Sequence, residues 1–512
     1  MSNDHLNKRL ILFALPFIVL VFYVTAGSHF GYTPDDTYIY LQFAKNILHG
    51  KGISFNAGEP TYGFTSPLWM FIISLSGVLG TDLYTAAKAI DLFFAGMSIL
   101  IYYFVAYEVI RETIVSILAT LAYSLNIWLL RWAGSGMETS LAVFLMLIAF
   151  LFTLRNEYVF ATVCAALLAL VRPEACLLIV IILLDLYINS HDKQRARKMM
   201  IVAASLYVLL LAPWLMYAFM TFGTITPTTV RVKSHVGLDI GDMIQEFWNI
   251  CKIIGASDGI GLVVMIVSGV LLLRNFSRDG LPFPTNEEKF YVFRVSVLAL
   301  GWLILIPLLY TIMHVHAVSR YLLLVTPFIT ILAFTYVFRL LLRSPMNRFA
   351  YAGVVLLAGV MITQSQIVYQ ATVKPGIEAF QVGMEASLVS IGEWLKQNTK
   401  PEDVILVWDI GALGYYSDRK ICDGAGIASP EMIPYVKAGH TAEEVVTQKL
   451  YQSSCDADYI VYRSEEPEAM KKNANLIPLF TKPFYRMGLL NMELRYYTVY
   501  KVRKNLKTDR VN

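Results

Sequence analysis

Apolar residues fill most of the first two thirds of the chain, in runs whose lengths match the thickness of a bilayer. A helix needs about 20 mostly apolar residues to cross the hydrocarbon core, although somewhat shorter segments also occur. A further apolar stretch, residues 67–80, is short. The pattern predicts about 11 membrane-spanning helices, at residues 10–27, 84–108, 113–131, 138–154, 157–171, 174–189, 199–220, 259–274, 292–312, 321–343 and 349–369.

Charged residues follow the opposite pattern and gather near the end of the chain. Residues 372–512 hold 18 basic and 18 acidic side chains, out of 80 charged residues in all. We therefore expect a transmembrane domain at 1–371 and a water-soluble domain at 372–512. Helical periodicity in the second part covers 376–398, and strand patterns cover 404–408, 457–462 and 496–502. The predicted fold class is a polytopic α-helical membrane protein with a C-terminal α/β domain.

The distribution of Lys and Arg predicts how the spans are oriented, because basic loops favour the cytoplasmic side. The densest basic segment is 191–198, and Lys8 with Arg9 precede the first span. If these basic segments are cytoplasmic, the C-terminal domain lies on the outer face, together with the segments 28–66, 132–137, 221–258 and 313–320. This parity requires 67–80 to be an interfacial or re-entrant helix rather than a span. The predicted location is the cell (inner) membrane, with many passes and an extracytoplasmic C-terminal domain.

Composition excludes several classes of protein. Apolar residues make up 56% of the chain and charged residues 16%, with a mean hydropathy of +0.56. An average soluble domain has about 25% charged residues, so a soluble enzyme and a disordered chain are excluded. A net charge of +4 gives no reason to expect a nucleic-acid partner. The five cysteines have no metal-binding spacing.

The first predicted outer loop carries two adjacent carboxylates, Asp35 and Asp36. Adjacent residues do not share a helix face, so one can face a cavity while the other caps a helix expected at 36–48. A solvent-exposed helix start is an equally good interpretation. Two aromatic residues, Tyr62 and Trp69, follow in a loop rich in Gly, Pro and Asn. They suit a membrane interface and would equally stack on a sugar ring.

Five more charged residues lie at predicted outer ends of spans: Glu138, Arg172, Glu174, Lys233 and Arg320. Ionisable groups at membrane depth usually face a cavity or a partner. For the two Glu residues, capping of the helix that each begins is an equally good interpretation. Arg172 can simply pair with a carboxylate, and Arg320 can extend to the interface. Outer cations nevertheless run against the usual bias, which favours an anion-binding role for Arg320 and Lys233.

One segment of the C-terminal domain also has candidate chemistry. Asp409 follows the strand at 404–408 and precedes Gly411 and Gly414. The two Gly residues are typical of a tight strand-to-helix turn, and the segment has neither GxGxxG nor the Lys-Ser/Thr of a phosphate loop. A structural turn is the preferred interpretation, although Asp409 at a strand end can still reach a ligand.

These residues together resemble the GT-C class of integral membrane glycosyltransferases, which use polyprenyl-phosphate sugars on the outer face. The likeness extends to the terminal arabinofuranosyltransferase family and its bacterial relatives. The chain departs from that family's pattern at Gln42, where Arg is common, and at Tyr62, where an acidic residue is common. Both departures lie near the expected site, so the donor sugar is left open. The first loop matches the family's motifs at Asp35, Asp36, Tyr38, Ile39, Ala44, Asn46, Gly50, Gly52, Asn56, Gly58, Glu59, Gly63, Thr65, Pro67, Leu68 and Trp69. Later matches are Gly136-Met137-Glu138-Thr139, Arg172-Pro173-Glu174, Thr229 with Lys233, Arg320-Tyr321 and Asp409-Ile410-Gly411-Ala412.

The resemblance implies an inverting single displacement, in which an acceptor hydroxyl attacks the anomeric carbon as lipid phosphate leaves. Asp35 is expected to act as the base, and Asp36 to orient or cap. Arg320 and Lys233 are expected to bind the phosphate. Glu138 and Glu174 are expected to hold sugar hydroxyls or to position Arg172. No cofactor is implied, and a divalent metal is possible but not required.

The expected partners are membrane lipid, a polyprenyl-phosphate sugar and an acceptor that is a glycan, a lipid or a protein. The main alternative is a polytopic transporter or a flippase for lipid-linked sugars. Transporters tend to have internal repeats and broken helices, and the sequence pattern reveals neither. An oligosaccharyltransferase would need a metal site and a peptide groove, which the sequence does not identify. A non-catalytic receptor is the third alternative.

Overall fold

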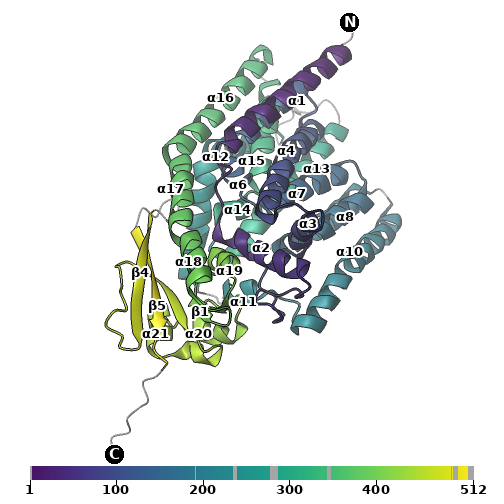
Figure 1. The fold of residues 1–512 in the computed structure, drawn as a ribbon. Helices are drawn as coiled ribbons and strands as arrows, with labels where there is room; N and C mark the ends of the chain where they lie inside the picture. Colours follow the sequence, from purple (N-terminus) through teal and green to yellow (C-terminus); the bar gives the residue numbers. More distant parts are fainter. Residues whose placement is uncertain are drawn as a thin grey trace, which may run out of the picture. The chain divides into compact units, whose positions relative to one another are not determined.

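The computed structural model describes residues 3–190, 192–233, 239–276, 286–342, 347–485, 487 and 494–504. Helices form most of it, and the named strands all lie in the C-terminal part (Figure 1). The chain divides into two compact units, each built from several segments. The first unit comprises Met1–Phe30, Lys88–Pro213 and His235–Val373, and the second comprises Gly31–Ala87, Trp214–Ser234 and Lys374–Asn512.

The first unit consists of apolar helices. Its helices are α1 (Asn3–Gly27), α4 (Leu83–Ile110), α5 (Thr113–Ser124), α6 (Ile127–Trp132), α7 (Thr139–Leu154), α8 (Tyr158–Ala169), η1 (Pro173–Leu177), α9 (Leu178–Asn189), α10 (Lys193–Phe222), α12 (Ile240–Phe276), α13 (Asn286–Ile312), α14 (Ser319–Leu322), α15 (Thr326–Leu342), η2 (Asn347–Phe349), α16 (Ala350–Val368) and η3 (Tyr369–Val373). Helices α4 and α10 begin or end in the second unit. Each of the predicted spans coincides with one helix or with two consecutive helices, so the predicted fold class is confirmed.

Several of these helices are long and apolar enough to cross a bilayer. Among the described residues, six helices meet that condition by length and composition: His5–Gly27, Leu83–Ile110, Lys193–Phe222, Ile240–Arg274, Phe290–Ile312 and Ala350–Asn398. Shorter apolar helices are Pro67–Val78, Thr113–Ser124, Thr139–Leu154, Tyr158–Ala169 and Thr326–Leu342. The chain is therefore a multi-pass membrane protein. The count of about 11 spans and the re-entrant character of 67–80 stay predictions.

Helix α12 is broken at Asp258, whose φ of −127° and ψ of 20° are not helical. The side chain of Gln364 on α16 replaces part of the interrupted ladder. It accepts the N–H of Ile260 at 3.1 Å and donates to the carbonyl of Gly255 at 3.0 Å. Inside a bilayer, freed backbone groups need such a partner. The break lies at the predicted boundary between the outer segment 221–258 and the span 259–274.

The second unit combines the first predicted outer loop with the C-terminal domain. Its helices are α2 (Asp35–Leu48), α3 (Pro67–Val78), α11 (Thr228–Lys233), α17 (Lys374–Met384), η4 (Glu385–Val389), α18 (Ser390–Asn398), α19 (Ile410–Ser417), η5 (Pro430–Met432), α20 (Ile433–Lys437), α21 (Ala442–Thr447) and η6 (Leu450–Ser453). Its strands are β1 (Val404–Val407), β2 (Lys420–Asp423), β3 (Tyr459–Ser464), β4 (Leu476–Tyr485) and β5 (Leu494–Val502). One boundary between the units falls at Val373–Lys374, and the predicted placement of the domains in and outside the membrane stays a prediction.

The strands form one mixed sheet in the order β2-β1-β3-β5-β4. Strand β1 is parallel to β2 and β3, whereas β5 is antiparallel to β3 and β4. The buried residues Leu406, Ile460 and Tyr500 belong to its core. The sequence predicted β1, β3 and β5 and missed both edge strands. Strand β2 has only four residues, and β4 contains Pro478 and Pro483, which are tolerated at a sheet edge.

The first loop is attached to the edge strand β2 by the side chain of Asn56. Its Nδ2 donates to the carbonyl of Ile421, and its Oδ1 accepts the N–H of the same residue, both at 2.9 Å. Asn56 thus supplies the two bonds that a further strand would make. Asn46 holds the loop itself by donating to the carbonyls of Ser54 and Phe55. These two motif residues therefore have structural partners.

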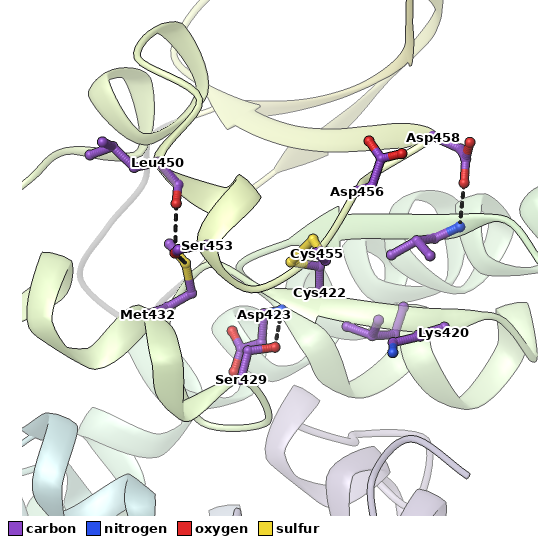
Figure 2. Close-up of a disulfide and its surroundings, with 12 residues drawn as sticks. Lys420, Cys422, Asp423, Ser429, Met432, Leu450, Ser453, Cys455, Asp456 and Asp458 are labelled. Atoms are coloured by element: carbon purple, nitrogen blue, oxygen red, sulfur yellow. Dashed lines mark hydrogen bonds between the residues drawn. A yellow bond between two sulfur atoms is a disulfide. The ribbon is translucent and has the colours of Figure 1, made fainter. Parts of the chain in front are cut away.

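A disulfide joins Cys422 on β2 to Cys455, which precedes β3 (Figure 2). Beside it, the buried carboxylate of Asp423 accepts the N–H groups of Ala425 and Ala428 at 2.8 and 2.7 Å. The N–H of Asp423 donates to the hydroxyl of Ser429 at 3.0 Å. Residues 423–429 therefore form a turn ordered by their own hydrogen bonds.

Candidate functional site

Asp35 is the first residue of α2 and is held by the N-terminus of α19. Its two carboxyl oxygens accept the N–H groups of Gly411 and Ala412, each at 2.8 Å. Both belong to the second unit. These N–H groups lie in the first turn of α19, where no intrahelical partner is available to them. Asp35 therefore caps a helix that lies 376 residues later in the chain.

The residue at the N-cap position of α19 is itself an aspartate, Asp409, and makes no capping bond. Its carboxylate points to other partners instead. It accepts from Nη1 of Arg463 on β3, at 3.1 and 3.3 Å, and from the hydroxyl of Tyr497 on β5, at 2.6 Å. Asp is among the residues that most favour this position. Asp35, rather than Asp409, therefore accepts the free N–H groups at the start of α19.

The two carboxylates line one cavity of about 420 Å³ in the second unit. One wall is apolar and includes Phe380, Met384 and Leu388, which are spaced four residues apart and so share a helix face. The remaining lining residues are Arg463, Phe484, Met487 and Arg495. The cavity is large enough for a small ligand. It offers a ligand an apolar surface beside a group of charged side chains.

The environment of Asp35 changes its acidity. Burial and the negative charge of Asp409 raise the pKa of the Asp35 carboxyl to about 7, with a smaller contribution from Asp36. The N–H groups of Ala412 and Gly411 act in the opposite direction, because they stabilise the carboxylate. A carboxyl with a pKa near the working pH is suited to accept a proton in catalysis. The environment of Asp35 therefore gives it an acidity suited to proton transfer near neutral pH.

A second group of predicted residues comes together in the first unit, around Arg172. This guanidinium lies 3.1 Å from Oε1 of Glu138 and 3.3 Å from Oε1 of Glu174. Glu174 also accepts the hydroxyl of Tyr310 at 2.7 Å. Glu138 is 2% exposed and Arg172 is 4% exposed. Glu138 stands at the N-cap of α7 without a capping bond, so its side chain binds Arg172 rather than the helix end.

Arginine and aromatic side chains alternate beside this ion-pair cluster. The guanidinium carbon of Arg172 lies 4.9 Å from the ring centroid of Tyr321. Arg320 lies 5.3 Å from the same ring and 5.3 Å from the ring of Trp132. The guanidinium carbon of Arg131 lies 5.2 Å from the ring centroid of Trp132, so the series ends with a third arginine. Stacking on the two rings brings three guanidinium groups into one small region. Such a group of cations is suited to bind an anion.

The other predicted site residues are placed differently. Tyr62 is buried among aromatic rings, stacking on Phe222 at 5.2 Å and accepting Nε1 of Trp214 at 2.8 Å. Trp69 is fully buried on α3. Neither lines the cavity beside Asp35, and their binding of substrate stays a prediction. Lys233 ends α11, and its side chain lies outside the described residues.

Asp36 is the second residue of α2, and the helix starts one residue earlier than the sequence pattern predicted. The N-cap position belongs to Pro34, which makes no side-chain capping bond. The interpretation of Asp36 as the cap of this helix is therefore wrong. Its carboxylate contributes to the site through its charge, which adds to the effect of Asp409 on Asp35.

Sequence reasoning missed four residues of the two groups: Arg463, Tyr497, Tyr310 and Arg131. The first two lie on strands and bind Asp409, and only the position of Asp409 at a strand end indicated a ligand-binding edge. Arg131 stands next to Trp132 at the end of α6, and that pairing was the available signal. Among the described residues, no group of three or more His, Cys, Asp or Glu side chains is arranged to hold a metal ion.

Comparison with known proteins gives one match to a family. Residues 376–503 match a domain of unknown function, DUF8728. That segment comprises nearly all of the C-terminal domain, including Asp409, Arg463 and Tyr497. No curated protein matches the chain.

Solved structures match nearly the whole chain. ArnT from Cupriavidus metallidurans in the apo state aligns over 94% of this chain and 97% of its own, with a TM-score of 0.58 and 12% identity. The same protein bound to undecaprenyl phosphate aligns over 96% and 98%, with a TM-score of 0.57 and 11% identity. The apo oligosaccharyltransferase of Archaeoglobus fulgidus aligns over 88% and 69%, with a TM-score of 0.54 and 14% identity. Both proteins are GT-C glycosyltransferases, so the chain has the GT-C fold.

Proposed function

We propose that this protein is an inverting glycosyltransferase. It transfers a sugar from a polyprenyl-phosphate donor to an acceptor hydroxyl of a glycan, lipid or protein at the outer face of the cell membrane. The fold supports the class, since the matched ArnT structure holds undecaprenyl phosphate. The observation that carries the proposal is the position of Asp35, which is fixed by two backbone N–H groups at the edge of a cavity.

The reaction proceeds in one displacement. Asp35 accepts the proton of the acceptor hydroxyl as its oxygen attacks the anomeric carbon. The bond from that carbon to the phosphate oxygen breaks, and the lipid phosphate leaves with the electron pair. Each oxygen of Asp35 accepts one backbone N–H, which leaves a lone pair on each for the proton. The two N–H bonds also fix the orientation of the carboxylate, which a base requires.

Arginines carry the second part of the proposal. The leaving phosphate gains charge as the bond breaks, and fixed cations stabilise that charge. Arg320 is assigned to this role, because its guanidinium stacks on Trp132 and Tyr321 at a predicted outer end of a span. Arg172 is already balanced by Glu138 and Glu174. The two carboxylates are assigned to sugar hydroxyls, and a divalent metal is not required.

The disulfide supports the outer location of the C-terminal domain. Disulfides persist in oxidising compartments and are rare in the cytosol. The bond between Cys422 and Cys455 lies in the sheet of that domain. The domain is therefore assigned to the extracytoplasmic side, in agreement with the basic-loop pattern.

The experiment is a transfer assay with purified protein. Labelled polyprenyl-phosphate pentoses and hexoses are supplied together with an extract of envelope glycans and lipids, and the label is followed into product. Wild type is expected to consume one donor class, and Asp35→Asn to lose about 10²–10⁴-fold of the rate. Asp418→Asn, which does not touch the cavity, is the matched control and should retain most of it. Near-normal transfer by Asp35→Asn would remove the base from the proposal.

A flippase is the alternative that the same materials test. In sealed vesicles, a flippase moves the labelled lipid across the bilayer without breaking the bond between sugar and phosphate. Recovery of intact labelled donor on the opposite leaflet, with no released lipid phosphate, would favour that function. Release of lipid phosphate in step with labelled product supports the transferase.

A further inference from the structure

We infer that the C-terminal domain is part of the catalytic centre and that Asp409, held by Arg463 and Tyr497, is a positioning residue for Asp35. The inference rests on the proposed function and extends it. It gives a role to residues 376–503, whose family has no assigned function. Asp35 comes from α2, whereas every group named as its hydrogen-bond partner comes from this domain.

The first argument is that Asp35 replaces Asp409 as the side chain that caps α19. An aspartate at the N-cap position normally accepts N–H groups of its own first turn, and Asp409 does not. Asp35 accepts them instead. Two carboxylates cannot both accept the same N–H groups, so the orientation of Asp35 depends on Asp409 staying turned away. The bonds from Arg463 and Tyr497 hold Asp409 in that position.

The second argument is the close approach of the two elements. A Cβ at Gly411 would lie 2.0 Å from the backbone oxygen of Asp35 and 2.8 Å from its carboxyl carbon. Only glycine fits so near to another chain segment. The first turn of α19 is therefore shaped to receive Asp35, and a carboxylate at position 409 alone does not explain that shape.

The third argument is electrostatic. The charged and titratable groups that face Asp35 are Asp36 and Tyr38 on its own helix, Asp409 before α19, Arg463 on β3, and Tyr497 on β5. Arg495 on β5 lines the same cavity. Asp409 raises the pKa of Asp35, because a second negative charge opposes ionisation. Arg463 acts in the opposite direction, because a positive charge favours the carboxylate.

Substitutions of Asp409 and Arg463 should therefore shift the pKa of Asp35 in opposite directions. Asp409→Asn removes a negative charge, so the pKa of Asp35 should fall and the acid limb of the pH–rate profile should move to lower pH. Arg463→Gln removes a positive charge, so the limb should move to higher pH. The expected shifts are roughly one pH unit. A merely structural role would lower kcat in both variants without moving the limb in opposite directions.

Asp418 provides the matched control. It lies at the C-terminal end of the same helix and pairs with Lys45 at 2.7 Å and Lys396 at 3.2 Å. Asp418→Asn removes one negative charge from α19 without touching the cavity. It should leave the acid limb within about 0.2 pH units of wild type, because the Asp418 charge is solvent-exposed and is paired with Lys45 and Lys396. Asp409→Glu keeps the negative charge, so the acid limb of its pH–rate profile should lie closer to that of wild type than the limb of Asp409→Asn does.

A second readout does not need activity. A water-soluble carbodiimide modifies protonated carboxyl groups, and mass spectrometry of the Asp35 peptide gives the extent of modification against pH. Its midpoint should follow the same opposite shifts in Asp409→Asn and Arg463→Gln. Unmoved midpoints in both variants, or shifts in one direction, would overturn the inference. If the midpoints shift while no donor is consumed by wild type, the proposed function fails and the positioning role of Asp409 stands.

Discussion

Gly411 and Asp35 approach so closely that no side chain fits between them: a Cβ at position 411 would lie 2.0 Å from the backbone oxygen of Asp35. The N–H of Gly411 donates to the Asp35 carboxylate at 2.8 Å. The glycine is therefore required by space rather than by backbone conformation. The same contact fixes the proposed base.

Gly411→Ala should displace Asp35 and lower the rate of transfer by at least tenfold, because a displaced base no longer meets the acceptor hydroxyl. The assay is single-donor transfer with purified protein, together with a thermal unfolding curve. The control is Gly359→Ala on α16, where a Cβ would meet nothing within 4 Å. That variant should keep its rate and lose no stability. Equal rates in the two variants would contradict the close contact.

The sequence predicted the apolar helices well, because long runs of apolar residues are typical of helices buried in lipid. It also selected Asp35, because two adjacent carboxylates next to a span are unusual. It could not identify Gly411 and Ala412 as partners, because no local pattern links residues 376 positions apart. The Asp409 segment was interpreted as a tight turn, which describes its backbone but not the capping of α19 by Asp35.

Other misses have local causes. Strand β2 has four residues, which is too few for a clear alternating pattern. The break at Asp258 coincides with the predicted start of the span 259–274, where Gly255, Gly259 and Gly261 flank a charged residue. Gly and a polar side chain together weaken a helix at that point. Tyr62 suited a membrane interface by type, and its burial against Trp214 and Phe222 depends on distant segments.

Arg172→Leu should destabilise the protein strongly. It leaves Glu138, which is 2% exposed, with a buried charge and no cation partner in the pair. Removing one member of a buried ion pair costs about 3–5 kcal/mol. The measurement is unfolding of the purified protein in detergent, by denaturant or heat. We expect the midpoint of the unfolding transition to fall by much more than the error of the measurement.

The control for this variant is Arg155→Leu. Arg155 pairs with Glu108 at 2.8 Å, and its side chain is 42% exposed. Water replaces the lost partner there, so the cost should be about 0–1 kcal/mol. A similar loss of stability in both variants would show that the Arg172 cluster is not buried as described.

The proposed reaction should depend on pH through Asp35. Its pKa of about 7 predicts that kcat/KM rises tenfold per pH unit below 7 and reaches a plateau above it, because the base must be deprotonated. Stability should change in the opposite sense. The folded-state pKa lies above the unfolded value of about 3.9, so the contribution of Asp35 is present below pH 4 and is lost as pH rises to 7. The difference in unfolding free energy between wild type and Asp35→Asn isolates this contribution. A rate that is flat between pH 5 and 8 would exclude Asp35 as the titrating base.

The disulfide predicts how the cysteines react in living cells. Cys422 and Cys455 are joined, whereas Cys164, Cys176 and Cys251 are free. If the C-terminal domain is extracytoplasmic, a permeant alkylating agent added to intact cells should leave Cys422 and Cys455 unmodified until a reductant is supplied. The double variant Cys422→Ser, Cys455→Ser should lose about 2–4 kcal/mol of stability, and Cys251→Ser, as control, much less. Mass spectrometry of the two peptides reads the result. Alkylation of Cys422 and Cys455 in cells without reductant would place the domain in a reducing compartment, and the proposed acceptor would then have to be cytoplasmic.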